Sequence, residues 1–515
     1  MTQLSQHNAP AVYLGVDIGT SGCRTVAIDA DGRTLAVGEA SYPLHTPSPG
    51  WAEQDPNDWI AGAIATIASV AASGAFDPAA VRGIGIDGQS WSCVPVDEAG
   101  EVLANTPIWM DTRCQSICDE LLAEIPAAEI LALSGNRLSP SYSTAKVIWF
   151  ARQHPEIYAR TRWFLQSNSL IVLALTGVAS QDHSQGYGLH FVDVATGTVD
   201  AAMARRLGID PTRFPSPVEP TAIVGGLTRA TAERVGLPEG TPVVAGGLDA
   251  ACGTLGAGVY RPGQTQEQGG QAGGMSIALA APVADERLIL SRHVVPGSWL
   301  LQGGTVAGSA SLAWLTKVIG EAERLAGIAA SRSPFAEVSA LAATSPRGAG
   351  GLIFLPYLSG ERSPLWDADA RGAFVGLTLG TTRADLYRAV LEGVAMSLRH
   401  NLEVAAAAGA EVTELLAIGG ATRSPLWMQI KADITGVPLV VSAEDFATPL
   451  GAAMLAAIGT GAGTATDLVD RWVRRGSEYH PDPAATASYD HLYRTYAGLY
   501  PAMAEGMHQL AAFGR

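Results

Sequence analysis

A glycine-rich turn near the start of the chain has the residue types needed to bind phosphate. It runs Asp17-Ile18-Gly19-Thr20-Ser21-Gly22 and follows an apolar segment typical of a buried strand. Glycines let the backbone approach a phosphate closely, and successive N–H groups in such a turn form an anion-binding nest. Asp17 ends the strand, where a carboxylate is placed to hold Mg²⁺ directly or through water, and Arg24 adds a positive charge. The alternative is an ordinary hairpin turn, which the same residue types also favour.

Three other phosphate or nucleotide motifs are excluded. A Walker-type loop needs Gly-Lys, but none of the three lysines (Lys146, Lys317 and Lys431) follows a glycine. The motifs of protein kinases are absent as well. Gly83-x-Gly85-x-x-Gly88 matches the dinucleotide fingerprint, but its glycines alternate within a predicted strand and no helix follows. We therefore interpret that match as coincidence.

The turn must be positioned by strands on both sides of it. The pattern predicts a meander over 12–29 and 34–41, a helix over 56–72 capped by Asn57, and a strand over 81–87. Similar elements recur later, with strands predicted over 242–248, 264–268, 276–280 and 414–418. A long helix over 384–408 should bury its apolar stripe and expose Arg388, Glu392 and Arg399. We infer two α/β lobes, each offering a glycine turn to a shared cleft, with the boundary near 253–263.

The bulk composition restricts the partners and the location. At 515 residues the chain is long enough for two domains, and its net charge of -16 disfavours nucleic acid and anionic membranes as partners. Five scattered cysteines do not form a disulfide framework, so we expect a cytoplasmic protein. Cys114 and Cys118 lie one helical turn apart, but no second ligand pair accompanies them, so a zinc site is not expected.

Two long segments resemble the signatures of the FGGY family of carbohydrate kinases. The first is Ser141 to Gln153 (SYSTAKVIWFARQ), and the second begins at Gly372-Ala373-Phe374-Val375-Gly376-Leu377 and resumes at Asp385 to Glu392 (DLYRAVLE). Their order and length make the resemblance specific, although helix stripes such as these can be structural. The resemblance implies two actin-like ATPase (ribonuclease H-like) domains with a central cleft. It places residues 1–10 in a loose tail, an N-terminal domain over 11–253 and a C-terminal domain over 254–515.

The resemblance also implies roles for individual residues. Asp249, in Gly246-Gly247-Leu248-Asp249, would be the general base that accepts the proton of the sugar hydroxyl, while Asp17 would bind Mg²⁺. ATP and its phosphates would contact residues of three loops and Arg24: Gly19, Thr20, Ser21, Gly22, Gly270, Gln271, Gly273, Gly419, Gly420, Ala421 and Ser424. In the second of these loops Gln271 and Ala272 replace the hydroxyl residues common in the family.

The sugar pocket departs from the branch that the chain resembles most. Segments 109–113 and 356–366 resemble xylulokinases, but Ser90 and Trp91 stand where those enzymes have Met-His, and Ala250 stands where they have asparagine. A site that loses hydrogen-bonding groups tends to change its preference. The residues expected to line the pocket are Gln89, Trp91, Trp109, Asp111 and Asp249. For Trp91 and Trp109, simple packing at the edge of the cleft is the alternative.

We therefore predict an enzyme that phosphorylates a small ketose or polyol with ATP and Mg²⁺. D-xylulose is the leading acceptor, and ribulose, erythritol and glycerol-like polyols are alternatives. An actin-like ATPase without a sugar substrate, or a regulatory protein descended from a kinase, would explain the phosphate loops but not the two signatures. We expect neither nucleic acid nor membrane as a partner, and a homodimer is possible.

Overall fold

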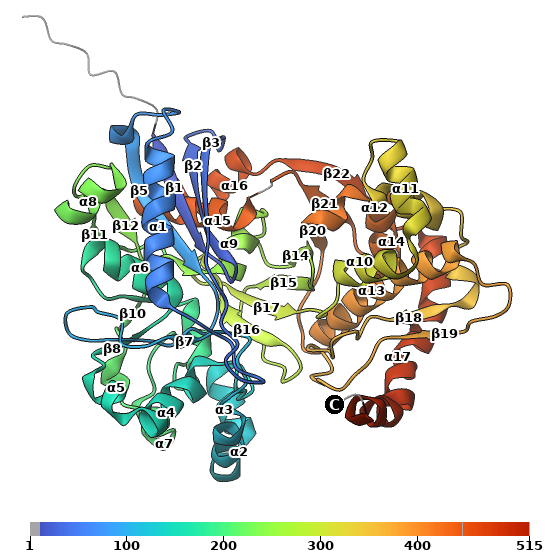
Figure 1. Ribbon diagram of the computed structural model, residues 1–515, viewed down its shortest axis with the longest axis horizontal. Helices are drawn as coiled ribbons and strands as arrows, with labels where there is room; N and C mark the ends of the chain where they lie inside the picture. The colour runs from blue at the N-terminus through green and yellow to red at the C-terminus, as the bar shows by residue number, and fades with distance from the viewer. Residues whose placement is uncertain (1–10, 445, 514–515) are drawn as a thin grey trace, which may run out of the picture.

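The computed structural model describes residues 11–444 and 446–513, so the predicted tail at 1–10 lies outside the described residues. Two seven-stranded sheets form the centres of two lobes (Figure 1). The first sheet contains β11 (Ile223–Gly226), β12 (Pro242–Val244), β5 (Val81–Gly88), β1 (Val12–Ile18), β2 (Gly22–Asp29) and β3 (Thr34–Ser41) in that order, with β13 (Gly247–Leu248) paired to β5. The second contains β16 (Ile289–Arg292), β17 (Trp299–Gly303), β15 (Gly273–Leu279), β14 (Gln264–Gly269), β20 (Glu414–Ile418), β21 (Leu439–Ser442) and β22 (Arg475–Tyr479).

The two sheets repeat one arrangement, as the sequence predicted. In the first, β2 is antiparallel to β1 and β3, and β5 runs parallel to β1. In the second, β15 is antiparallel to β14 and β17, and β20 runs parallel to β14. Each antiparallel hairpin therefore carries a glycine-rich turn at the same end of its sheet, next to the carboxyl end of a parallel neighbour. Ligands of α/β sheets bind at such carboxyl ends.

Helices and short strand pairs complete both lobes. The helices of the first half are α1 (Pro56–Ala71), α2 (Gln115–Glu124), α3 (Ala127–Ser134), α4 (Ser143–Gln153), α5 (Pro155–Arg160), α6 (Ser167–Thr176), α7 (Ala201–Arg206), α8 (Arg229–Val235) and α9 (Asp249–Gly256). Those of the second half are α10 (Ser309–Ile319), α11 (Glu321–Ala329), α12 (Pro334–Ala342), α13 (Arg383–Ala407), α14 (Pro425–Thr435), α15 (Ala447–Gly459), α16 (Ala465–Trp472) and α17 (Pro483–Phe513). The short pairs are β4 (Glu53–Gln54) with β7 (Thr106–Pro107), β6 (Val94–Val96) with β8 (Trp163–Leu165), β9 (Gln181–Asp182) with β10 (Pro217–Val218), and β18 (Ile353–Leu355) with β19 (Ala373–Val375).

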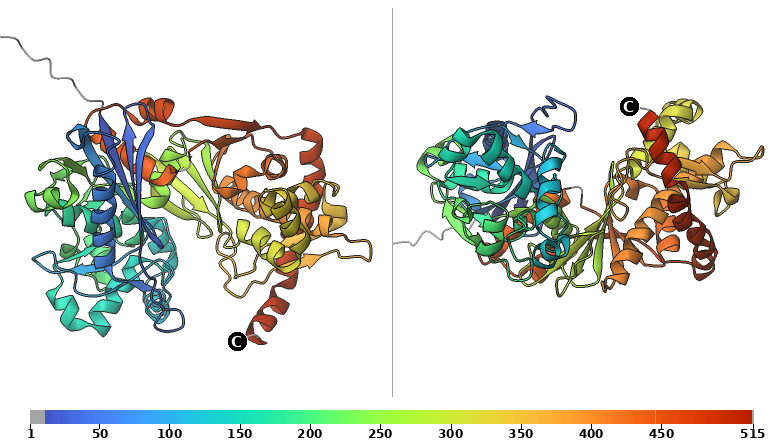
Figure 2. Two further views of the ribbon diagram at one scale, coloured as in Figure 1. Left: turned by 45° about the horizontal axis from the view of Figure 1, so that its top comes forward. Right: turned by 90° about the horizontal axis from the view of Figure 1, so that it is seen from below.

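The second half of the chain returns to the first lobe near its end. α15 packs against β1, β5 and α9 (Figures 1 and 2). The indole N–H of Trp472 in α16 donates to the carbonyl of Ala30. A Cβ on Gly15 would lie 1.8 Å from the carbonyl oxygen of Pro449, and one on Gly85 would lie 1.9 Å from that of Ala452. These glycines therefore permit the close approach of α15 to the sheet. The dinucleotide-like spacing over 83–88 falls within β5, which confirms that it is a coincidence.

Two local predictions were wrong. Asp55, not Asn57, caps α1, because its carboxylate accepts the N–H of Asn57. Arg388 and Glu392 of α13 are buried rather than exposed, because α17 covers that face and the hydroxyl of Tyr489 bonds to both side chains. None of the helices within 11–444 and 446–513 is long and apolar enough to cross a membrane.

Candidate active site

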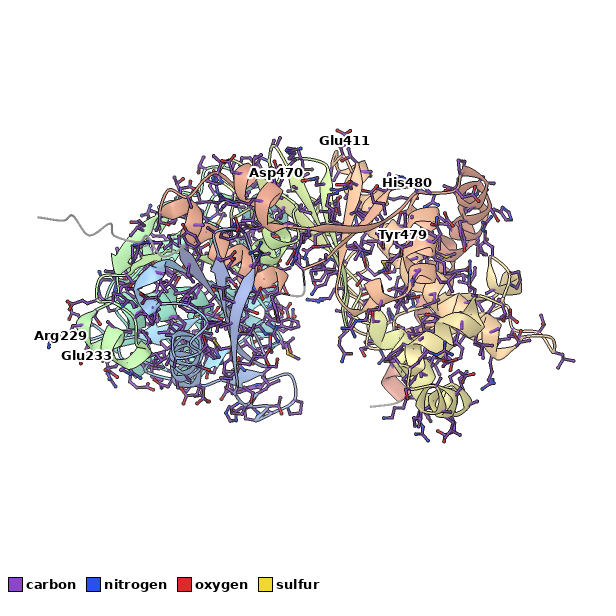
Figure 3. All side chains as sticks on the ribbon, turned by 90° about the horizontal axis from the view of Figure 1, so that it is seen from above. Arg229, Glu233, Glu411, Asp470, Tyr479 and His480 are labelled. Carbon is purple, nitrogen blue, oxygen red and sulfur yellow. The ribbon has the colours of Figure 1, made fainter. Side chains whose placement is uncertain are left out.

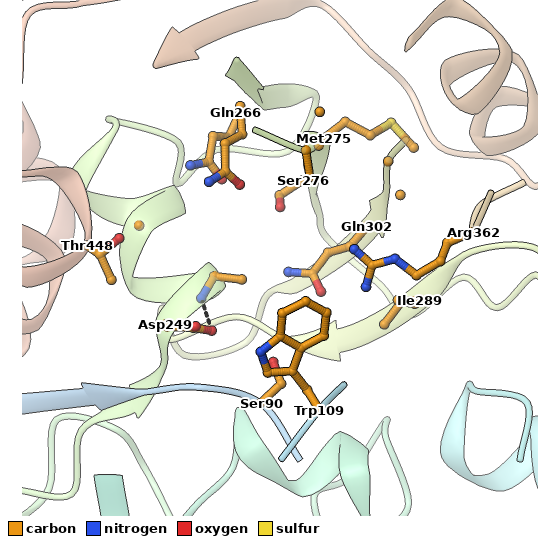
Figure 4. A pocket seen from close by; sticks show the side chains of 18 of the residues that line it. Ser90, Trp109, Asp249, Gln266, Met275, Ser276, Ile289, Gln302, Arg362 and Thr448 are labelled. Atoms are coloured by element: carbon orange, nitrogen blue, oxygen red, sulfur yellow. Dashed lines mark hydrogen bonds between the residues drawn. The ribbon is translucent and has the colours of Figure 1, made fainter. Parts of the chain in front are cut away.

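A cavity of about 410 Å³ lies where the two sheets face each other, within the size range of small-molecule sites. Its lining comes from both lobes (Figure 4). The predicted site residues that line it are Asp17, Gly19, Thr20, Trp91, Trp109, Asp249 and Gly273. The first turn, the proposed base and the second glycine turn therefore share one cavity, although they are far apart in the sequence.

Asp249 is held in place by a tight turn and a buried polar network. Gly246, just before it, has a φ of +75°, and a Cβ there would meet the carbonyl oxygen of Ile86 at 1.8 Å. The N–H of Leu248 donates to the hydroxyl of Ser184, which in turn donates to the buried carboxylate of Asp182. As a result Asp249 begins α9 at the rim of the cavity, and its Oδ1 accepts the N–H of Ala250 at 2.6 Å.

Burial raises the pKa of the carboxyl groups of the cavity, and the charge of Asp17 raises that of Asp249 further. Burial, followed by the charge of Asp17, raises the pKa of Asp249 to about 7, against the weaker opposing effect of the Ala250 amide. Burial also raises the pKa of Asp17, while an interaction with the Asp87 carboxyl group and then the charge of Arg24 lower it. A carboxyl group with a pKa near 7 is suited to accept a proton at neutral pH.

The sequence analysis missed a third carboxyl group, Asp87. It is fully buried at the end of β5 and is the register partner of Asp17 on β1. Neither of its oxygens receives a hydrogen bond from a described donor. Burial, followed by the charge of Asp17, raises the pKa of Asp87 well above its usual range. The signal that identified Asp17, a carboxylate ending an apolar strand, was also present at Asp87.

These residues fit the way that proteins bind Mg²⁺ together with a nucleotide. Among the described residues no group of three or more His, Cys, Asp or Glu side chains is arranged to hold a metal ion. Mg²⁺ in phosphotransferases usually keeps several waters and contacts one or two carboxylates plus the phosphates. Asp17 lines the cavity beside the first glycine turn, so its carboxylate is available for that role.

The first turn is connected to the predicted sugar pocket by side-chain hydrogen bonds. The indole N–H of Trp109 donates to the Thr20 hydroxyl at 2.9 Å, and that hydroxyl donates to Gln89 at 3.3 Å. Gln54 donates to the carbonyl of Thr20 at 2.8 Å, and the hydroxyl of Tyr42 donates to the carbonyl of Gly19 at 2.5 Å. The conformation of the turn is therefore coupled to the position of the Trp109 ring.

Several predicted residues of the first lobe lie outside the cavity lining. Arg24 pairs with Glu39 at 2.7 Å, and Gln89 is fully buried between Thr20 and Gln54. Asp111 is also fully buried, and its oxygens accept hydrogen bonds from Arg113 and from the N–H of Ala52. The structure therefore places Gln89 and Asp111 behind the pocket rather than in its wall. Ser21 and Gly22 continue the turn without lining the cavity.

The second turn and the predicted adenosine loop lie side by side. The carbonyls of Gly270 and Gln271 accept the N–H groups of Ser309 and Ala310 at the start of α10, and Gln271 is exposed. A Cβ on Gly419 would meet Gly269 at 3.0 Å, while Gly420 faces open space. Ala421 is buried against Gly269, and Ser424 caps α14 by accepting the N–H of Trp427. Ala272, Gly273 and Gly274 of the second turn line the cavity, as does Ile418, which ends the strand before the adenosine loop.

Aromatic side chains from the first lobe form one wall. Trp91 packs against Tyr142 with ring centroids 4.2 Å apart and lies 5.5 Å from the Tyr187 ring, and its backbone has a φ of +57°. The buried ammonium group of Lys146 donates to the carbonyls of Trp91 and Ile108, each at 2.8 Å. Lys146, from the first signature, therefore fixes both segments that carry the cavity tryptophans, and burial lowers its pKa to about 8.

The second lobe contributes polar side chains that the sequence analysis did not select. Gln266, Ser276 and Gln302 are register neighbours on β14, β15 and β17, and all three line the cavity. Arg362 enters from the loop after β18, and its guanidinium lies 5.4 Å from the centre of the Trp109 ring (Figure 4). Arg362 falls inside the quoted segment 356–366, but no spacing rule connects that segment to Trp109.

Comparisons with known proteins cover almost the whole chain. Residues 12–256 match the N-terminal domain model of the FGGY family of carbohydrate kinases, and residues 276–460 match its C-terminal domain model. The chain is 31% identical to a xylulose kinase of Staphylococcus epidermidis over 95% of this chain and 96% of that protein. It is 30% identical to a glycerol kinase of Ralstonia nicotianae over 91% and 93%. The solved xylulose kinase of Rhodospirillum rubrum is 35% identical, with a TM-score of 0.89 over 96% of this chain and all of that one.

Proposed function

The chain belongs to the FGGY family of carbohydrate kinases, and from that premise we propose that it transfers the γ-phosphoryl group of ATP to a terminal hydroxyl group of a small ketose or polyol, with Asp249 as the general base. The observation that carries the assignment of the base is that Asp249 shares one cavity with both glycine turns. Burial and the neighbouring Asp17 give it a pKa near 7, which suits proton transfer at neutral pH.

Each element of the cavity has a proposed part in the reaction. The amides of the turn at 19–22 and the second turn around Gly273 bind phosphate oxygens, and the loop at 419–421 with Ser424 lies on the adenosine side. Asp17 would hold Mg²⁺, whose charge would offset that of the phosphates. Asp249 orients the acceptor hydroxyl and takes its proton as that oxygen attacks the γ-phosphorus.

D-xylulose is the first acceptor to test. Relatives of similar identity are named for xylulose and for glycerol, so similarity alone leaves the acceptor open. The aromatic wall of the cavity suits the apolar face of a small sugar. We further propose that the sugar binds before MgATP and that the lobes then close, because an open site would waste ATP on water.

An acceptor panel coupled to ADP release tests this function. The purified protein is assayed with D-xylulose, ribulose, erythritol and glycerol, and also without acceptor. Acceptor-dependent ADP formation is expected, and Asp249→Ala should abolish it while ATP binding by calorimetry persists. Equal ATPase rates with and without every acceptor would instead favour an actin-like ATPase. Absence of ATP binding by the wild-type protein would favour a regulatory role.

A further inference from the structure

Arg362 is a cation inside the cavity that forms no ion pair with any described residue. Among the described residues its guanidinium makes neither an ion pair nor a side-chain hydrogen bond, although most of the residue is enclosed. The adjacent carboxylate of Glu361 acts on the guanidinium electrostatically but forms no ion pair with it, because it accepts hydrogen bonds from the Thr305 hydroxyl and from the N–H groups of Val306 and Arg362. An enclosed guanidinium binds most strongly to a ligand that offers two adjacent oxygens, because two of its N–H groups can then donate parallel hydrogen bonds.

A second polar group beside it also lacks a partner. Gln302 is only 9% exposed, and its amide nitrogen forms no hydrogen bond with any described residue. Both side chains extend from the second lobe into the cavity toward Trp109 of the first lobe (Figure 4). A buried amide donor without an acceptor is costly, so a site with such a donor is complementary to a ligand that supplies an oxygen.

The loop that carries Arg362 is anchored rather than free. Glu361 is bound to Thr305 and Val306, and the hydroxyl of Ser363 accepts the N–H of Gly304 at 2.6 Å. The carbonyl of Thr305 also accepts the N–H of Gly273 in the second glycine turn at 3.0 Å. The position of Arg362 is therefore fixed relative to the phosphate-binding side of the same lobe.

Arg362 lies at the end of the cavity occupied by aromatic side chains. Its nearest described ring is that of Trp109, and Tyr142 and Tyr187 lie close enough to act on it electrostatically. The glycine turns and Asp17 line the same cavity, but Trp109 and Tyr187 belong to the aromatic wall proposed for the sugar. This location favours a contact with the acceptor over a contact with ATP.

We propose that Arg362, assisted by Gln302, is a specificity-determining residue that binds two oxygens of the acceptor at the end remote from the hydroxyl facing Asp249. The inference rests on the proposed function. In this arrangement both lobes contact the acceptor. Arg362 and Gln302 supply hydrogen-bond donors to a pocket whose first-lobe wall contains Ser90, Trp91 and Ala250. The two oxygens belong either to the hydroxyketone end of a ketose or to the carboxylate of a sugar acid.

Steady-state kinetics of Arg362→Gln and Arg362→Lys test the proposal, with D-xylulose and D-xylonate as acceptors. Loss of a charge-assisted pair of hydrogen bonds should raise KM for the preferred acceptor about 10- to 100-fold in Arg362→Gln, with KM for MgATP within about twofold of wild type. Arg362→Lys should recover part of the loss. The acceptor with the larger change identifies the source of the two oxygens.

The matched control is Arg229→Gln, the same chemical change on the surface of α8, where the arginine side chain is 81% exposed and pairs with Glu233 (Figure 3). It should behave as wild type. A rise in KM for MgATP with an unchanged acceptor KM would overturn the proposal, because Arg362 would then bind phosphate. Unchanged constants in Arg362→Gln would also overturn it. A wild-type protein without acceptor-dependent turnover would instead refute the proposed function itself, on which the inference depends.

Discussion

The acidic limb of the pH–rate profile should report the ionisation of Asp249. A general base must be deprotonated, and the pKa of this carboxyl group is raised to about 7, first by burial and then by the charge of Asp17. With that pKa, roughly 90% of Asp249 is ionised at pH 8 and roughly 10% at pH 6. The rate at subsaturating acceptor should therefore fall about tenfold between these pH values. Bound MgATP can move this limb in either direction, because Mg²⁺ favours ionised Asp249 whereas the phosphate oxygens disfavour it.

The same pKa predicts how the stability of an Asp249→Asn variant depends on pH. The folded-state pKa is raised above the unfolded value, so ionised Asp249 destabilises the fold, fully above pH 7 and progressively less as the pH falls toward 4. A shift from 3.8 to about 7 corresponds to at most about 4 kcal/mol, and water in the cavity reduces it. The inactive variant should therefore be more stable than wild type at pH 8 and equal to it near pH 4.

Two assays and one control decide this prediction. ADP release is measured from pH 5 to 8.5, and urea unfolding of the wild type and Asp249→Asn is measured at pH 4 and pH 8. Asp470→Asn, which removes an exposed carboxylate from α16 (Figure 3), should change neither result. A rate that stays constant down to pH 5, or an Asp249→Asn variant less stable than wild type at pH 8, would refute the argument.

Further predictions concern packing, a buried ion pair and the link between the turn and the pocket. Gly85→Ala should destabilise the protein severely, because the new Cβ would lie 1.9 Å from a backbone oxygen of α15, whereas Gly506→Ala in α17 meets no atom within 4 Å and should raise the melting temperature slightly. Lys431→Met should cost roughly 3–5 kcal/mol in urea unfolding, because it leaves Glu267 buried without its ion pair, and adding Glu267→Gln should recover most of that loss. Thr20→Val removes the acceptor of the Trp109 indole N–H, so it should raise KM for both the acceptor and MgATP; a change in only one of them would contradict the coupling.

The sequence determined most of the local structure around the site. Short-range patterns fixed the strand–glycine turn–strand units, the strand over 414–418 and the long helix near 384–408, because strand and helix periodicities and glycine backbone freedom are properties of neighbouring residues. The segment before Asp249 was recognisable for the same reason. Lys146 belongs to the first signature, for which the sequence analysis gave a structural role as an alternative, and its side chain is fully buried.

Tertiary structure alone decided which side chains face the cavity. Asp111 and Gln89 belong to pocket-forming segments but turn toward Arg113 and Gln54, because their hydrogen-bonding groups find partners behind the wall. Arg388 and Glu392 are buried by a helix that begins about ninety residues later in the chain. Arg362 meets Trp109 because two lobes face each other, and no periodicity or spacing encodes a contact between residues so distant in sequence.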